Sequence, residues 1–317
     1  MGVRHAPHST VGVVRTSVKI SLAVAGLVVV LAAAVTAGVL LWRPAFLFGP
    51  ECTVPGDPAA AATAPTVELT AVQLQHASTI NAVGLSRGIP ERGRIIAIAT
   101  AYQESTLRNL PNGDRDSVGL FQQRPSQGWG TAQQIGDPVY ASNKFYDALV
   151  QVARWQDLPL TEAAQAVQYS AFPNAYAQWE SRATTLVRAL SGKTALQLTC
   201  RADAPAPTAD SPQRPLPAGA DRATASLAAV LSSANAELGG LTVQSVTGDG
   251  HTGSAAIAAT ELTPAAAGRS LAAWAVAHSA GLQITEVVTA EQRWRDNEWQ
   301  DAASATNPAQ VQITVAR

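Results

Sequence analysis

One glutamate stands near the end of an Ala/Ile-rich stretch that has the composition of a helix starting at Pro90. Ala101, Thr100 and Ala97 precede Glu104 at spacings that place them on its face of a helix. Apolar neighbours and the negative end of the helix dipole both disfavour a carboxylate, so both raise the pKa of Glu104. A carboxyl that stays protonated near neutral pH can act as a general acid on a glycosidic bond. The alternative is a solvated surface glutamate.

A polar loop follows this acid, and it holds two further carboxylates and several amides. Asp114 or Asp116 could serve as the base for an attacking water, which would give inversion at the sugar. The alternative is that both are turn formers in the segment "NGDRDS", as aspartate commonly is. Gln122 and Gln123 can both donate to and accept from sugar hydroxyls.

Two short motifs of this stretch resemble a known family. The pair Glu104-Ser105 and the segment Gly119-Leu120-Phe121-Gln122 resemble the lysozyme-like lytic transglycosylase superfamily, with soluble lytic transglycosylases and goose-type lysozymes as relatives. The longer stretch around them is similar to lysozyme-like cell-wall domains of actinobacteria. The resemblance implies a lysozyme-like fold, Glu104 as general acid and base, and a 1,6-anhydro product formed without water or cofactor. It also implies a tyrosine that hydrogen-bonds the acid or the sugar. Our candidate substrate-binding residues are Ser105, Ser117, Gln122, Gln123 and, as rival tyrosines, Tyr169 and Tyr176.

The elements around these motifs are predicted to be helical. Helical patterns start at Thr70, Pro90, Ser142, Thr161 and Tyr176, and no strand alternation competes with them. We therefore predict an all-helical domain over residues 66–200.

The N-terminus predicts a membrane anchor. Residues 1–19 are basic, and residues 20–42 form an uncharged apolar run of the length that spans a bilayer, about 20 residues. The basic flank predicts a cytoplasmic tail, with everything after a spacer at 43–65 on the extracytoplasmic side. The alternative is a long, cleaved signal peptide. The net charge of -1 gives no electrostatic reason to expect nucleic acid as a partner.

The chain has two cysteines, Cys52 and Cys200. In an exported chain they predict a disulfide that brackets the helical domain; the alternative is two unpaired thiols. No CxxC or Cys/His spacing predicts a metal or redox site.

A Pro-rich linker at 201–221 precedes a region of mixed type, residues 222–317. Strand patterns near 241–246, 282–290 and 311–317 flank a helix pattern at 263–281, which predicts a small α+β domain. The segment from Asp249 with His251 and Ala256 resembles the zinc D-Ala-D-Ala carboxypeptidases (VanY-like). A catalytic zinc needs three protein ligands and only His251 matches, so we expect a degenerate, metal-free copy. The alternative is an unrelated α+β module.

Together these features predict a single-pass membrane protein whose extracytoplasmic part cleaves peptidoglycan glycan strands as a lytic transglycosylase. One alternative is a non-catalytic, peptidoglycan-binding assembly factor of an envelope or secretion machine. Another is a lysozyme that uses water. The expected partners are peptidoglycan, the membrane through residues 20–42, and other cell-envelope proteins.

Overall fold

The computed structural model describes Gly2 and residues 51–59, 64–169, 174–201, 226–258, 261–302 and 307–316. The predicted cytoplasmic tail beyond Gly2, the membrane span at 20–42 and nearly all of the linker at 201–221 lie outside the described residues. Within the described part, no helix is long and apolar enough to cross a membrane.

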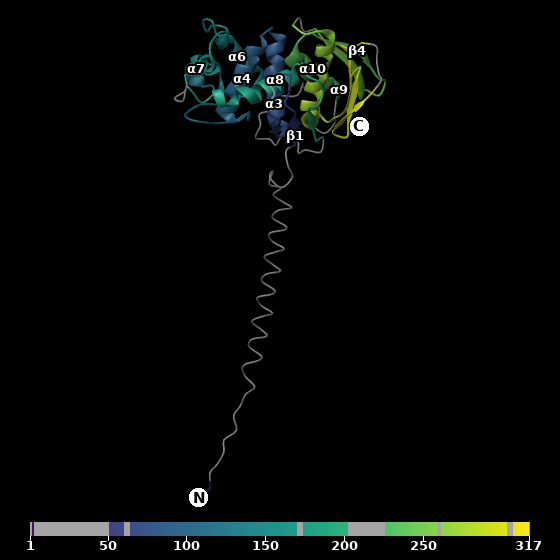
Figure 1. Ribbon diagram of the computed structural model, residues 1–317, viewed down its shortest axis with the longest axis horizontal. Coiled ribbons are helices and arrows are strands. Elements are labelled where there is room, and N and C mark those ends of the chain that lie inside the picture. Colours follow the sequence, from purple (N-terminus) through teal and green to yellow (C-terminus); the bar gives the residue numbers. More distant parts are fainter. Residues whose placement is uncertain are drawn as a thin grey trace. The chain divides into compact units, whose positions relative to one another are not determined.

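Residues 51–317 form one compact unit, and its first region is mainly helical (Figure 1). The bounds are α3 Ala71–Ser86, α4 Glu91–Ser105, α5 Ala132–Ile135, α6 Pro138–Leu149, α7 Leu160–Gln168 and α8 Glu180–Leu190, with 3-10 turns at η1 Pro125–Gln127 and η2 Ala177–Trp179.

The start of α3 follows from its sequence. The Thr70 hydroxyl accepts a hydrogen bond from the backbone of Gln73, and the Gln73 side chain accepts one from the backbone of Thr70, which is a capping box. Every residue of α3 from His76 to Leu85 is buried, so this helix has no solvent-facing side. A helix of this kind must be surrounded by other elements.

A small antiparallel sheet joins the two ends of the helical region. It contains β1 Cys52–Val54, β2 Val67–Leu69 and β3 Thr199–Cys200, in the order β2-β1-β3. The prediction of an all-helical region missed this sheet, because strands of two or three residues carry too little alternation to be seen. It also placed β1 in a spacer.

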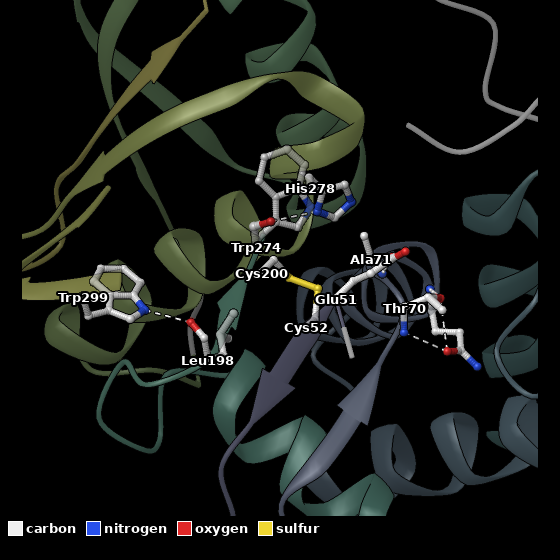
Figure 2. Close-up of a disulfide and its surroundings, with 10 residues drawn as sticks. Glu51, Cys52, Thr70, Ala71, Leu198, Cys200, Trp274, His278 and Trp299 are labelled. Carbon is white, nitrogen blue, oxygen red and sulfur yellow. Dashed lines mark hydrogen bonds between the residues drawn. A yellow bond between two sulfur atoms is a disulfide. The ribbon is translucent and has the colours of Figure 1, made fainter. Parts of the chain in front are cut away.

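The predicted disulfide is present and links β1 to β3. Cys52 and Cys200 face each other in the sheet, and their sulfurs are bonded (Figure 2). Next to them, Glu51 accepts a hydrogen bond of 2.8 Å from the backbone of Ala71, at the first residue of α3. The bridge therefore fastens the start of the helical region to its end.

The second region is α+β. Its elements are α9 Leu227–Leu238, β4 Leu241–Val246, β5 Thr252–Ile257, α10 Pro264–Ala277, α11 Ser279–Leu282, β6 Ile284–Val288, β7 Gln292–Arg295, β8 Glu298–Asp301 and β9 Val311–Val315. The strands form one antiparallel sheet in the order β4-β5-β9-β6-β7-β8. Helices α9 and α10 pack against the sheet, whose strands carry buried side chains such as Ile313, Val287 and Trp294.

The α+β region packs directly on the helical one. Both α9 and α10 contact α3, and they lie between the helices and the sheet (Figure 1). The Ser270 hydroxyl donates to the Leu190 carbonyl at 2.8 Å, and the Trp299 indole donates to the Leu198 carbonyl at 2.8 Å (Figure 2). Buried side chains of both regions belong to one continuous core, so α9 and α10 supply part of the cover that α3 needs.

Candidate active site around Glu104

Glu104 is the penultimate residue of α4, where the negative end of the helix dipole lies. Its side chain is half-buried, and its Oε1 accepts a hydrogen bond of 2.7 Å from the Tyr176 hydroxyl. Burial raises the pKa of Glu104 above its ordinary value. Hydrogen bonds from Tyr176 and Gln168 favour the charged form and offset only part of that rise.

The residue after the acid ties the helix to the following loop. Ser105 is buried, and its hydroxyl lies 2.8 Å from the Leu120 carbonyl oxygen and 3.0 Å from that of Ala101. Its partners are therefore backbone carbonyls, and this serine fixes the Gly-Leu-Phe-Gln segment against the end of α4.

That segment forms a tight turn. The backbone of Val118 donates to the carbonyl of Gln123 at 2.9 Å, and the four residues from Gly119 to Gln122 close the turn. Gly119 has a φ of +83°, and a Cβ at this position would lie 2.7 Å from the Ile135 carbonyl oxygen. The turn therefore requires glycine at this position.

Gln168 connects this turn to the acid. Its Nε2 donates to the Phe121 carbonyl at 2.9 Å, and the same side chain hydrogen-bonds Glu104. The Phe121 ring stacks on Phe145 with centroids 4.6 Å apart, which anchors the turn in the core. Gln168 was not among the residues predicted for the site. Its position directly before the candidate tyrosine Tyr169 is the feature of the sequence that could have suggested it.

The predicted sugar-binding amides differ in their exposure. Gln122 is half-buried and donates to the Gly119 carbonyl at 3.1 Å. Gln123 is buried and donates to the Ala141 carbonyl at 3.2 Å, so it holds the loop onto α6. Ser117 is also buried. Of these three, Gln122 is the residue that the structure leaves partly accessible.

The two aspartates lie in the loop as turn formers do. Asp116 accepts hydrogen bonds from the backbone and hydroxyl of Ser126 and from Arg124, at 2.7 to 3.0 Å. These contacts hold the pKa of Asp116 well below its usual range, and the hydrogen bond from the Ser126 backbone has the largest effect. The exposed Asp114 accepts a hydrogen bond of 3.1 Å from the backbone of Ser117 through its carbonyl oxygen.

The structure separates the two rival tyrosines. Tyr169 is 85% exposed and ends α7 with a φ of 51°, whereas Tyr176 is fully buried with its hydroxyl on Glu104. Residues 170–173, between the two, lie outside the described residues.

A further group beside Glu104 was not predicted. Trp179 stacks on Tyr102 with ring centroids 5.0 Å apart, and its indole donates to Gln103 at 2.8 Å. The exposed Gln178 also donates to Gln103, at 3.2 Å. Aromatic and amide side chains of this kind are suited to sugar binding. Their signal in the sequence was a Gln-Trp pair just after Tyr176.

In the α+β region, an imidazole nitrogen of His251 lies 3.2 Å from the Ala316 carbonyl oxygen, at the end of the chain. Among the described residues, no three His, Cys, Asp or Glu side chains gather closely enough to hold a metal ion.

The sequence matches no protein-family model, and a search of curated proteins finds no match either.

Proposed function

We propose that this protein cleaves the glycan strands of peptidoglycan, with Glu104 as general acid and then general base. The observation that carries the proposal is the half-buried Glu104 carboxyl, whose pKa is raised and to which Tyr176 donates. The resemblance to lysozyme-like proteins rests on two motifs, Glu104-Ser105 and Gly119–Gln122. Ser105 joins them through its hydrogen bond to the Leu120 carbonyl, and this contact supports a lysozyme-like helical region.

The reaction begins with protonated Glu104. Its proton passes to the glycosidic oxygen while the bond from that oxygen to C1 of the sugar breaks. The oxygen of the same sugar's C6 hydroxyl then bonds C1, and the hydroxyl proton passes to the Glu104 carboxylate. The product carries a 1,6-anhydro end, no water is consumed, and Glu104 is protonated again. Between the two transfers, the hydroxyl of Tyr176 stabilises the carboxylate.

The surroundings of Asp116 favour this route over hydrolysis with inversion. An inverting enzyme needs a second carboxylate that is free to activate water. Asp116 is engaged by Arg124 and Ser126, and its strongly lowered pKa makes it a weak base. Asp114 is the remaining candidate for a water-using enzyme.

We further propose that the enzyme is anchored in the cell membrane by residues 20–42, with its C-terminal regions outside the cytoplasm. The uncharged apolar run at these positions supports the anchor. The Cys52–Cys200 disulfide supports an oxidising compartment.

The test uses residues 51–317, which form one compact unit. Purified peptidoglycan is incubated with the wild type, with Glu104→Gln, and with Glu162→Gln, which alters an exposed glutamate on α7. We expect release of soluble fragments by the wild type and by Glu162→Gln, and a loss of roughly 100- to 10,000-fold in Glu104→Gln. Equal release by Glu104→Gln would overturn the role of this residue. Binding to the wall without any release, by the wild type itself, would favour the assembly-factor alternative.

A further inference from the structure

The turn behind Glu104 has an unusual backbone. Thr106 and Leu107 directly follow the end of α4, and their φ angles are 53° and 58°. Non-glycine residues occupy this left-handed region only where the surrounding structure imposes it. The backbone N–H groups of Thr106 and Leu107 donate to the carbonyls of Tyr102 and Ala101, at 2.9 and 3.1 Å, and so close the helix.

Two side chains of α3 hold the carbonyls of this turn. Gln73 donates from Nε2 to the Thr106 carbonyl at 2.9 Å, and His76 Nδ1 lies 2.8 Å from the Leu107 carbonyl oxygen. Gln73 and His76 are three residues apart, so they share one face of α3. Gln73 is itself fixed, because its Oε1 accepts from the backbone of Thr70 at 2.9 Å.

The chemical state of His76 follows from its partner. A carbonyl oxygen can only accept, so Nδ1 of His76 must carry the hydrogen. Burial lowers the pKa of His76 to about 4, so at neutral pH the ring is neutral. His76 is therefore a buried, uncharged donor aimed at the turn.

The α+β region packs against the helix that carries this histidine, because both α9 and α10 contact α3. Glu237 lies in the last turn of α9, and His278 is the residue directly after α10. Glu237 accepts from the Trp274 indole at 2.8 Å and lies 3.4 Å from His278 Nε2, so this pair is itself held in place. His76 is itself buried, at 6% exposure, on a helix that the α+β region covers.

We infer that His76 and Gln73 are positioning residues, which hold the turn at Thr106 and Leu107 and thereby aim the Glu104 carboxyl. Glu104 is separated from this turn by one residue, so a shift of the turn shifts the acid. The expected effect on catalysis rests on the proposed function, whereas the role of His76 and Gln73 in fixing the turn does not depend on it.

The experiment compares His76→Asn with His76→Leu in the full-length protein. Asparagine keeps an N–H donor near the place of Nδ1, and leucine has a similar size without a donor. His251→Asn serves as the control, since His251 lies in the α+β region and its ring contacts the Ala316 carbonyl instead of the turn. Hydrogen exchange of the Thr106 and Leu107 amides is measured first, then fragment release from peptidoglycan as kcat and KM.

In His76→Leu we expect both amides to exchange roughly tenfold faster or more, because the Leu107 carbonyl has lost its donor. We also expect kcat to fall about tenfold or more with little change in KM, since a misplaced acid slows the chemical step. His76→Asn should recover most of both effects, and His251→Asn should match the wild type. Wild-type exchange in His76→Leu would overturn the inference, and so would equal losses in the Asn and Leu variants. If the wild type releases no fragments, the proposed function fails, and the exchange rates alone decide the role of His76.

Discussion

The hydroxyl of Tyr176 offers a sharp test of how Glu104 works. Tyr176→Phe removes one oxygen from a fully buried ring and leaves the rest of the side chain in place. That oxygen donates to Glu104 Oε1 at 2.7 Å, in the range of a charge-assisted hydrogen bond. Such bonds contribute about 1.5–3 kcal/mol, which corresponds to a loss in kcat of roughly 10- to 100-fold.

The same change should alter the pH profile in a known direction. Burial raises the pKa of Glu104, and the bond from Tyr176 opposes that rise. Removing the opposing bond raises the pKa of Glu104 further, so the alkaline limb of the rate profile should move to higher pH.

The assay is release of fragments from peptidoglycan across the pH range, with Tyr169→Phe as the matched control. Tyr169 is 85% exposed and lacks the contact with Glu104, so its variant should behave as the wild type. An unchanged rate and profile in Tyr176→Phe, or an equal loss in Tyr169→Phe, would show that the Tyr176 hydroxyl does not assist Glu104.

Three predictions concern stability. Replacing Cys52 and Cys200 by alanine should lower the free energy of unfolding by up to about 5 kcal/mol in the chain-entropy model, because the bridge joins residues 148 positions apart; an unchanged denaturant midpoint would contradict this. Folding lowers the pKa of His76 from 6.5 to about 4, so as the pH falls the unfolded chain takes up a proton at this residue before the folded protein does. The free energy of unfolding should therefore fall by about 3 kcal/mol between about pH 6.5 and pH 4. Denaturant titrations at several pH values should show this loss in the wild type and not in His76→Asn, and identical pH profiles would argue against it. Gly119→Ala should cost about 1–3 kcal/mol or more, because its φ is +83° and the new Cβ would strike a backbone carbonyl. Gly248→Ala, in open space, should have little effect on thermal unfolding, and equal losses in the two variants would count against the strained turn.

The parts of the fold that local chemistry determines could be predicted from the sequence. Thr70 and Thr263, where two of the predicted helical patterns begin, cap α3 and α10 through their side chains. The predicted order, a helical region followed by a region of helices and strands, is also present. The predicted pairing of Cys52 with Cys200 is confirmed, and a chain with two cysteines can form only this one internal disulfide.

Features that depend on tertiary packing could not be predicted in this way. The uniform burial of α3 gave no polar face to orient it, so the sequence did not show that α9 and α10 would cover it. The small sheet at Cys52 and Cys200 has strands too short to carry a pattern.

At the candidate site, the sequence suggested residues but could not show how their side chains are oriented. Gln122 and Gln123 are adjacent and chemically identical, yet Gln123 is buried against the Ala141 carbonyl and Gln122 is partly accessible. Tyr169 and Tyr176 were likewise rival candidates, and the structure places the hydroxyl of Tyr176 against Glu104 while Tyr169 is exposed. His76 gave no signal, because its target is a backbone carbonyl 31 residues away in the chain.

The most direct test of the central claim is the chemistry of the released ends. The wild type and Glu104→Gln are incubated with peptidoglycan in water enriched in oxygen-18, and the soluble fragments are weighed by mass spectrometry. We expect fragments from the wild type alone, each lighter than a hydrated muropeptide by one water and free of the heavy isotope. Fragments of hydrated mass that carry oxygen-18, or equal release by Glu104→Gln, would contradict the central claim.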